Sequence, residues 1–139
     1  MKIRLDDVMQ SFSFPFDAVY YYYIPLETVL MFAGGVIYGK AVNGISTEED
    51  VRKNSENFIK LPQSGMEGRW KVIKGFLEGF PKGRIKELIS ESVRSRDLQG
   101  FENVLREERL LIEWYNYRDD IYGEFARRWC EANGLELIR

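Results

Sequence analysis

The sequence contains no histidine and only one cysteine, Cys130. Without histidine the chain lacks the parts for a Ser–His or Cys–His nucleophile pair, a histidine-ligated metal site or a histidine pH switch. A single cysteine excludes an intramolecular disulfide and any Cys-x-x-Cys metal or redox site, so we interpret Cys130 as a packing residue. We therefore expect no catalytic residue, no metal and no cofactor, which favours a protein that is not an enzyme.

Long apolar runs are also missing. The stretch 18–38 is rich in apolar residues, but Pro25 and Glu27 interrupt it, so it lacks the ~18 consecutive apolar residues typical of a membrane-spanning helix. No cationic segment followed by an apolar run begins the chain, which argues against a signal peptide. We expect a cytoplasmic protein without membrane contact.

The charged residues nearly balance, with 20 lysines and arginines against 22 aspartates and glutamates. The net charge of −2 creates no whole-molecule field that would attract nucleic acid or an anionic membrane. Aromatic residues make up 14% of the 139 residues and supply large, rigid contact areas for a core. This length suits one domain, so we predict a single domain over residues 1–139.

Charge divides the chain into two parts. Residues 1–45 carry seven of the 42 charged side chains, and residues 46–139 carry the other 35. In the first part, aromatic and β-branched residues at 18–24 and 29–38 flank a Pro-containing turn, which predicts two antiparallel strands. Strands followed by helices indicate an α+β fold, with an N-terminal hairpin or small sheet packed against a helical C-terminal half.

The second part shows helical periodicity. Ser46 with Glu49 fits the S-x-x-E capping box, which predicts a short polar helix that extends to about Phe58. Ser64 with Glu67 fits a second capping box of the same kind. Residues 58–62 read as a short strand. Apolar spacing then predicts four helices, and Asn133-Gly134 is a typical end for the last of them. The four predicted ranges are about 66–80, 85–93, 98–105 and 110–131.

One glycine motif invites a phosphate-binding interpretation. Gly34, Gly39 and Lys40 match the pattern G-x-x-x-x-G-K, but Ala41 stands where Ser or Thr would hold magnesium. The residues that follow predict a turn and not the helix whose N-terminus would bind the anion. We therefore interpret these residues as strands joined by a glycine bend.

The last predicted helix carries a candidate binding site. Arg118 interrupts a stripe of apolar and aromatic side chains that we expect to face the core. A guanidinium there needs a partner, either a structural ion pair and aromatic stacking, or an anion in a cleft formed with Trp114 and Tyr115. We favour the structural role, and we interpret Asp119 and Asp120 as a solvated acidic face. The stripe consists of Leu111, Tyr115, Arg118, Tyr122, Phe125 and Trp129.

The helical part also separates charge by sign, with a net charge of +5 over residues 69–96 and −4 over residues 97–139. We favour the interpretation that these two blocks pair with each other, either within one chain or across a homodimer interface. The alternative is that the basic block contacts nucleic acid phosphates. Its aromatic residues Trp70, Phe76 and Phe80 lie on the apolar stripe, so we expect them in the core. The candidate nucleic-acid contacts are Arg69, Lys71, Lys74, Lys82, Arg84 and Lys86.

The last helix resembles a known family. LLIEWYNYRDD at 110–120 and ARRWCEANGL at 126–135 are similar to the C-terminal signature of the bacterial uncharacterised protein family 0158. The first segment matches its WY-x-[FY]-R-D core, and the second matches A-R-x-W followed by N-G. The matching residues are Trp114, Tyr115, Tyr117, Arg118, Asp119, Ala126, Arg127, Trp129, Asn133 and Gly134.

The resemblance covers about residues 58–138 and is weaker over 1–32, where YYYYIPLET resembles a family hairpin. The chain departs from the family at Val29, where the family has glycine, and around 94–98, where a glycine-rich segment is replaced. The resemblance implies a soluble bacterial protein without an established biochemical role.

Three functional hypotheses follow. The first is a non-enzymatic interaction or regulatory module that self-associates, which would make the protein a homodimer. The second is RNA or DNA binding through residues 69–96. The third is a small anion-binding or hydrolytic site at Trp114, Tyr115, Arg118 and Asp119.

Overall fold

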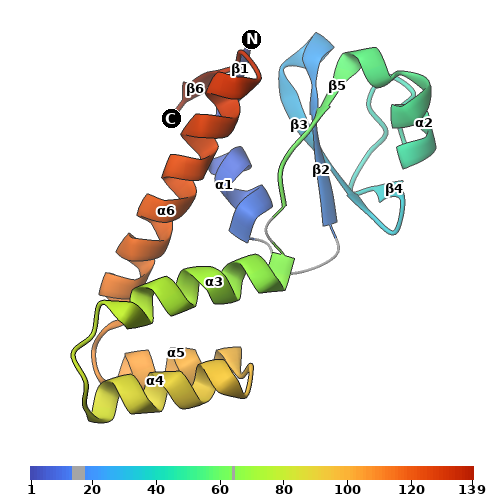
Figure 1. Cartoon of the computed structure of the whole chain (residues 1–139). Helices are drawn as coiled ribbons and strands as arrows, with labels where there is room; N and C mark the ends of the chain where they lie inside the picture. The colour runs from blue at the N-terminus through green and yellow to red at the C-terminus, as the bar shows by residue number, and fades with distance from the viewer. Residues whose placement is uncertain (14–17, 64) are drawn as a thin grey trace. The chain divides into compact units, whose positions relative to one another are not determined.

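The computed structural model describes residues 1–13, 18–63 and 65–139 (Figure 1). It contains two compact units: unit 1 comprises Met1–Gly65 and Tyr122–Arg139, and unit 2 comprises Met66–Ile121. The expected α+β class, with strands towards the N-terminus and helices in the C-terminal half, is confirmed. The boundary between the units does not follow the change of composition at residue 45. The single-domain assignment stays a prediction.

Unit 1 contains a four-stranded antiparallel sheet with the strand order β4-β3-β2-β5. The predicted hairpin is confirmed as β2 (Ala18–Tyr23) and β3 (Thr28–Ala33), joined by the short 3-10 helix η1 (Ile24–Leu26). β4 (Val36–Ile37) extends the sheet beside β3. The short strand predicted at 58–62 is confirmed as β5 (Phe58–Lys60), which pairs with β2.

The tyrosine run of β2 is explained by burial on both faces of this strand. Tyr23 packs in a cluster with Phe32 and Val51, and the half-buried Tyr21 lies against it. Tyr22, next in sequence, points to the opposite face because successive strand residues alternate. It is fully buried, and its hydroxyl donates a 2.7 Å hydrogen bond to the Lys2 carbonyl. A strand buried on both faces needs apolar residues throughout, and β2 has them.

Unit 1 also contains elements without a counterpart in the sequence analysis. β1 (Lys2–Arg4) and β6 (Glu136–Ile138) form a parallel pair, and α1 (Leu5–Ser13) follows β1. Val8 and Phe12 of α1 are buried four residues apart, as expected for one side of a helix. The parallel strands have three residues each, too few to show a periodic pattern.

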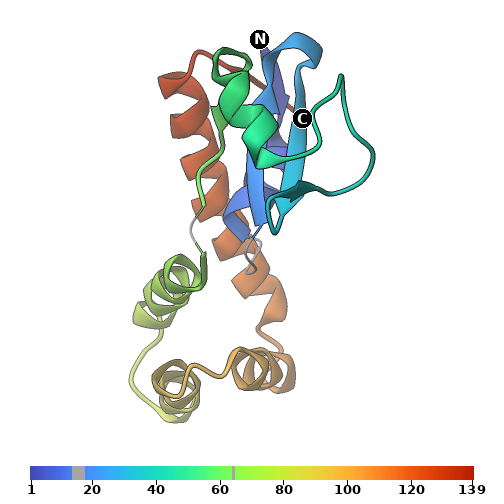
Figure 2. The same ribbon diagram turned by 90° about the vertical axis from the view of Figure 1, so that its right-hand side faces the viewer.

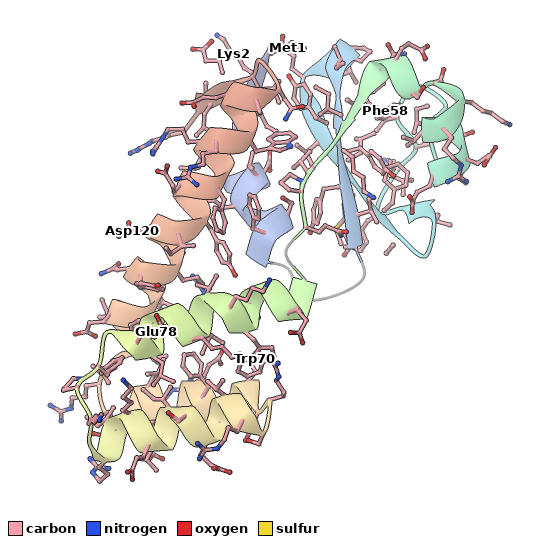
Figure 3. The ribbon with its side chains drawn as sticks, viewed as in Figure 1. Met1, Lys2, Phe58, Trp70, Glu78 and Asp120 are labelled. Atoms are coloured by element: carbon pink, nitrogen blue, oxygen red, sulfur yellow. The ribbon has the colours of Figure 1, made fainter. Side chains whose placement is uncertain are left out.

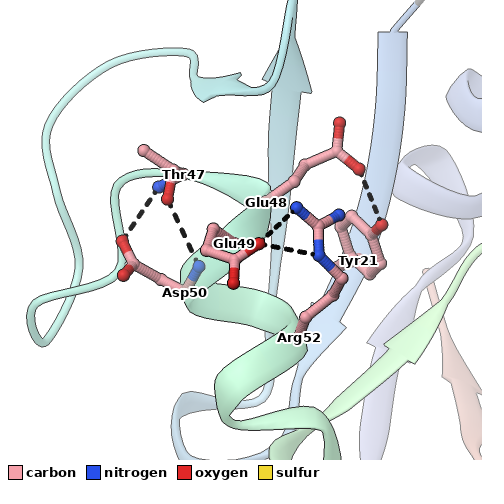
Figure 4. A network of polar contacts seen from close by, with 6 residues as sticks. All are labelled: Tyr21, Thr47, Glu48, Glu49, Asp50 and Arg52. Atoms are coloured by element: carbon pink, nitrogen blue, oxygen red, sulfur yellow. Dashed lines mark hydrogen bonds and ion pairs between the residues drawn. The ribbon is translucent and has the colours of Figure 1, made fainter.

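The helix α2 (Glu48–Lys53) corrects the first predicted capping box by one residue. Thr47, not Ser46, is the N-cap: its side chain accepts from the Asp50 backbone N–H, and the Asp50 carboxylate accepts from the Thr47 N–H (Figure 4). Glu49 instead forms an ion pair with Arg52 at 2.6 Å. The S-x-x-E and T-x-x-D patterns overlap here, and aspartate is short enough to reach the N-cap backbone.

α2 also ends earlier than predicted, at Lys53 and not near Phe58, because the 3-10 helix η2 (Ser55–Asn57) leads directly into β5. At the start of α2, Glu48 accepts a 3.0 Å hydrogen bond from the Tyr21 hydroxyl, which ties α2 to β2 (Figure 4). The second predicted capping box involves Ser64, which lies outside the described residues.

Unit 2 is helical. The four predicted helices are confirmed. They are α3 (Gly65–Glu78), α4 (Arg84–Arg94), α5 (Leu98–Glu107) and α6 (Leu111–Ala132). Only the first half of α6, up to Ile121, belongs to unit 2. α4 and α5 lie side by side in both views (Figures 1 and 2). The core centres on Trp114, whose ring lies 5.3 Å from Phe76 and 5.2 Å from Phe101. Three aromatic rings from three helices thus meet at one point.

The capping box of α2 predicts a specific pH dependence. Backbone N–H groups of Ser46 and Thr47 donate to Asp50 and hold the pKa of its carboxyl below its ordinary value. A lowered folded-state pKa adds stability above the unfolded aspartate pKa, and this stability is lost as the pH falls through the folded value. Asp50→Asn should therefore destabilise the protein near pH 7 and have little effect near pH 2, as read from urea unfolding midpoints.

The matched control is Asp120→Asn, because Asp120 is exposed and has no hydrogen bond or ion pair to the other described residues. We expect its midpoint to stay close to that of the unchanged protein at both pH values. Equal pH profiles for the two variants would contradict the capping role of Asp50.

Candidate functional site

The four predicted binding residues lie on the first half of α6, but they do not share one environment. Trp114 is only 3% exposed, because Phe76 and Phe101 enclose it. Tyr115, the next residue, is 39% exposed. Trp114 therefore belongs to the unit 2 core, and the structure does not place it with Tyr115 as a wall of an open cleft.

Arg118 finds its partners on its own helix. Its guanidinium carbon lies 4.8 Å from the centre of the Tyr115 ring, within range of a cation–π interaction. Both Nε and Nη2 approach Asp119 Oδ1 at 3.1 Å. These are the ion pair and the aromatic stacking expected of a structural arginine. We therefore assign Arg118 a local role in α6, and the anion-site hypothesis gains no support from its contacts.

The predicted core-facing stripe of α6 needs a correction. Two of its members, Tyr115 and Phe125, are 39% and 38% exposed. The residues of α6 that are buried are Trp114, Tyr122, Ala126 and Cys130. Aromatic side chains stand on more than one side of this helix, so periodicity alone allows more than one apolar face.

Cys130 is buried, with 2% of its surface exposed. Burial raises the pKa of its thiol, which disfavours the reactive thiolate. This environment agrees with the packing role expected from the sequence.

The glycine motif of residues 34–41 forms a turn, as predicted. Gly34 and Gly35 connect β3 to β4 with φ of +61° and +80°, a conformation that glycine adopts readily. The next helix, α2, begins only at Glu48. No helix N-terminus therefore follows Lys40 to complete a phosphate-binding loop.

The structure divides the basic block into paired and unpaired cations. Arg84 pairs with Glu108 at 2.8 Å, which links the basic and acidic blocks within one chain. Arg96 pairs with Glu67 at 3.5 Å and lies 5.5 Å from the centre of the Trp70 ring. Lys86 Nζ donates to the Phe80 carbonyl. The predicted contacts that are exposed and have no ion pair or hydrogen bond to other described residues are Lys71, Lys74 and Lys82.

Two of the three aromatic residues of the basic block are buried. Trp70 and Phe76 are 3% and 8% exposed, and in Figure 3 Trp70 lies among the side chains between α3 and the α4–α5 pair. The predicted core position is confirmed for these two residues, which cannot serve as stacking platforms for bases. Phe80, for which the same position was expected, is only partly buried and lines a surface pocket. On the exposed side of α3, Lys71 and Lys74 lie between Glu67 and Glu78, so the negative charges of these glutamates partly offset the positive charge of the lysines.

A surface pocket of about 260 Å³ lies between α3 and α4, lined by residues 80–85. Gly83 is the N-cap of α4 and provides no side-chain cap. Lys82 and Arg84 flank it in sequence, so the pocket combines cationic side chains with the positive end of a helix dipole. This is the part of the basic block best suited to hold an anion.

A second pocket, of about 300 Å³, lies where α5 ends and α6 begins. Its lining residues are Arg106, Arg109, Leu111 and Ile112, and of these the sequence analysis named only Leu111, as a member of the core-facing stripe. The available signal was the segment RLLI, in which an arginine adjoins three apolar residues at a helix boundary. Only the conformation of the turn brings Arg106 to the same pocket.

The described residues contain no group of three or more Cys, Asp or Glu side chains placed to hold a metal ion. Among the helices described, none has both the length and the apolar character needed to cross a bilayer. In Figure 3 the acidic residues Glu78 and Asp120 lie on separate helices.

The local role of Arg118 predicts a small effect of its replacement. Arg118→Met keeps much of the side-chain bulk and removes a charge that is partly exposed, so it should lower the unfolding free energy by at most about 1 kcal/mol. Trp114→Ala opens a cavity in the unit 2 core and should cost about 3–5 kcal/mol. Urea unfolding followed by circular dichroism measures both changes. Similar losses for the two variants would show that Arg118 does more than bind its neighbours on α6.

No protein-family model, no curated protein and no solved structure matches this chain. The resemblance to uncharacterised protein family 0158 stays a prediction based on residues 110–135.

Proposed function

We propose that this protein is a non-enzymatic interaction module that self-associates through an apolar surface on unit 1. The observation that carries this proposal is the exposure of two neighbouring apolar side chains. Tyr38 is 77% exposed and Val36 is 55% exposed. Val36 lies on β4, and Tyr38 follows this strand directly. Large aromatic side chains in such positions are typical anchors of protein interfaces.

The backbone around these residues is held in place. The Tyr38 N–H donates to the Met31 carbonyl at 2.8 Å, and the Ile37 N–H donates to the Ser46 carbonyl at 2.8 Å. Figure 2 shows the loop after β4 extending to one side of the sheet. An anchor on an ordered backbone loses less conformational entropy when it binds, which favours association.

A second copy of the chain is the proposed partner. A twofold interface would place the Val36–Tyr38 surface of one copy against the same surface of the other, so each exposed side chain would be covered by an equivalent one. The small net charge of −2 produces little repulsion between copies. Because Arg84 and Glu108 already pair within one chain, the charge blocks are not needed to join two chains.

The solution mass measured by light scattering tests this proposal. We expect twice the chain mass at both low and high salt, because apolar contacts are not screened by ions. Tyr38→Ser combined with Val36→Ser should reduce the mass to that of one chain. The control is Ile112→Ser, which removes another exposed apolar side chain, in unit 2, and should leave the dimer intact. A monomer before any substitution, or loss of the dimer with the control, would contradict the proposal.

A second candidate function is nucleic-acid binding by unit 2. It is supported by Lys71, Lys74 and Lys82, which have no acidic partner within the described residues, and by the pocket between α3 and α4. Cations not engaged in ion pairs can release counterions from phosphates, which makes the affinity fall steeply as salt is added.

Fluorescence anisotropy with mixed-sequence single-stranded and duplex oligonucleotides tests this second function. Changing Lys71, Lys74 and Lys82 together to Glu should abolish binding at low salt. The same charge change at Lys40, Lys53 and Lys60 in unit 1 is the matched control and should leave most of the affinity. Equal losses in the two triple variants would indicate unspecific attraction, and the absence of binding at low salt would exclude this function.

A further inference from the structure

The pocket between α5 and α6 joins two arginines to two aliphatic residues. Arg106 and Arg109 supply the charge, and Leu111 and Ile112 supply the apolar wall. Its volume of about 300 Å³ is at the lower end of the range for small-molecule sites. All four residues belong to unit 2, far in the sequence from the Val36–Tyr38 surface proposed for self-association.

Two arginines with the same left-handed backbone, Arg96 and Arg109, differ in their side-chain contacts, and this difference points to an external partner for Arg109. Arg96 and Arg109 both have left-handed backbones, with φ of 54° and 59°. This conformation is unfavourable for residues other than glycine and asparagine. Arg96 makes compensating contacts with Trp70 and Glu67. The Arg109 guanidinium forms no hydrogen bond or ion pair with any residue in the described part of the chain.

Arg106 adds a second guanidinium with spare donors. Its Nη1 donates to Asn103 Oδ1 at 3.1 Å, and a guanidinium has five N–H donors in total. Planar guanidinium groups bind carboxylates through paired N–H donors, which gives both affinity and a defined orientation. The charged side of this pocket is therefore suited to a carboxylate.

The apolar wall selects among anions. Ile112 is 73% exposed, a large value for an isoleucine, and it adjoins the two cations. An inorganic anion would leave this side chain in water, whereas a ligand with an aliphatic chain would cover it and gain from the burial of apolar surface. We propose that this pocket binds a small aliphatic carboxylate, with its head group at Arg106 and Arg109 and its chain along Leu111 and Ile112.

Titration of the full-length protein with hexanoate, acetate and 1-hexanol tests whether binding needs both the carboxylate group and the aliphatic part of the ligand. Chemical shifts of the Ile112 methyl groups report on the pocket directly. We expect saturable binding of hexanoate that is at least about tenfold tighter than binding of acetate, which lacks the chain, or of 1-hexanol, which lacks the charge. Failure of hexanoate to saturate these shifts would overturn the proposal.

Arg109→Gly tests the contribution of the Arg109 guanidinium to binding, because it removes this group without disturbing the fold. Glycine accepts the left-handed backbone of position 109, so the variant should unfold at the same temperature as the unchanged protein, or at a higher one. Its affinity for hexanoate should fall by about tenfold. Arg96→Gly is the matched control, because it makes the same change of charge and backbone outside the pocket, and it should bind hexanoate normally.

Ile112→Ser tests the apolar wall independently. Read from the methyl shifts of Leu111, it should weaken the binding of hexanoate while leaving the weak response to acetate unchanged, because acetate does not reach along the apolar wall. Unchanged hexanoate affinity in Arg109→Gly, or an equal loss in Arg96→Gly, would overturn the assignment of the site. The outcome is separate from the self-association test, which disrupts the proposed dimer at Val36 and Tyr38 of unit 1 and expects the control Ile112→Ser to leave that dimer intact.

Discussion

A single 22-residue helix, α6, buries side chains in both units of this protein. Trp114 enters the core of unit 2, where it meets Phe76 and Phe101. Tyr122, eight residues on, stacks against Phe12 of α1 in unit 1. Since each core needs its share of α6, a break in this helix would weaken both units. Packing here outweighs propensity, because Gly123, a poor helix former, lies within the continuous helix.

Within unit 1, the strand β2 has a structural role similar to that of α6 in the whole chain. It pairs with β3 on one edge and β5 on the other, and it buries side chains on both of its faces. The Tyr22 hydroxyl reaches the Lys2 carbonyl, and the Tyr21 hydroxyl reaches Glu48 of α2. A tyrosine can fill an apolar layer and still satisfy a polar group at its margin, which explains why this strand uses tyrosine repeatedly.

Charged side chains on the surface differ in whether the fold uses them. Arg84, Arg96 and Arg118 have partners within the chain, so their charges are explained by structure. Arg109 and three of the four lysines of the basic block, Lys71, Lys74 and Lys82, have none among the described residues. Tyr38 and Ile112 leave large apolar areas in water. These side chains contribute little to folding and remain available for contacts with other molecules. The proposed functions rest on that difference.

The amino-acid sequence alone was enough to predict the class of the fold, the β2–β3 hairpin, the short strand β5 and the four helices from α3 to α6. These elements carry local signals: alternation, helical periodicity and the Asn133-Gly134 end. The absence of histidine likewise settled which metal ligands and nucleophile pairs are missing. The roles of Arg118 and of Trp70 could also be anticipated, because a cation among apolar residues needs a partner and an aromatic stripe favours a core.

Three features could not be predicted from the sequence and are known only from the folded chain: the parallel pairing of β1 with β6, the buried side of α6 and the pocket between α5 and α6. β1 and β6 come from opposite ends of the chain, and segments of three residues contain no period. Trp114 and Tyr115 are adjacent aromatic residues, and it is Trp114 that packs against the rings of Phe76 and Phe101 and is buried. Arg106 and Arg109 join one pocket through a left-handed turn. Each of these outcomes depends on contacts between residues distant in sequence or on a backbone conformation, and neither is encoded in local residue patterns.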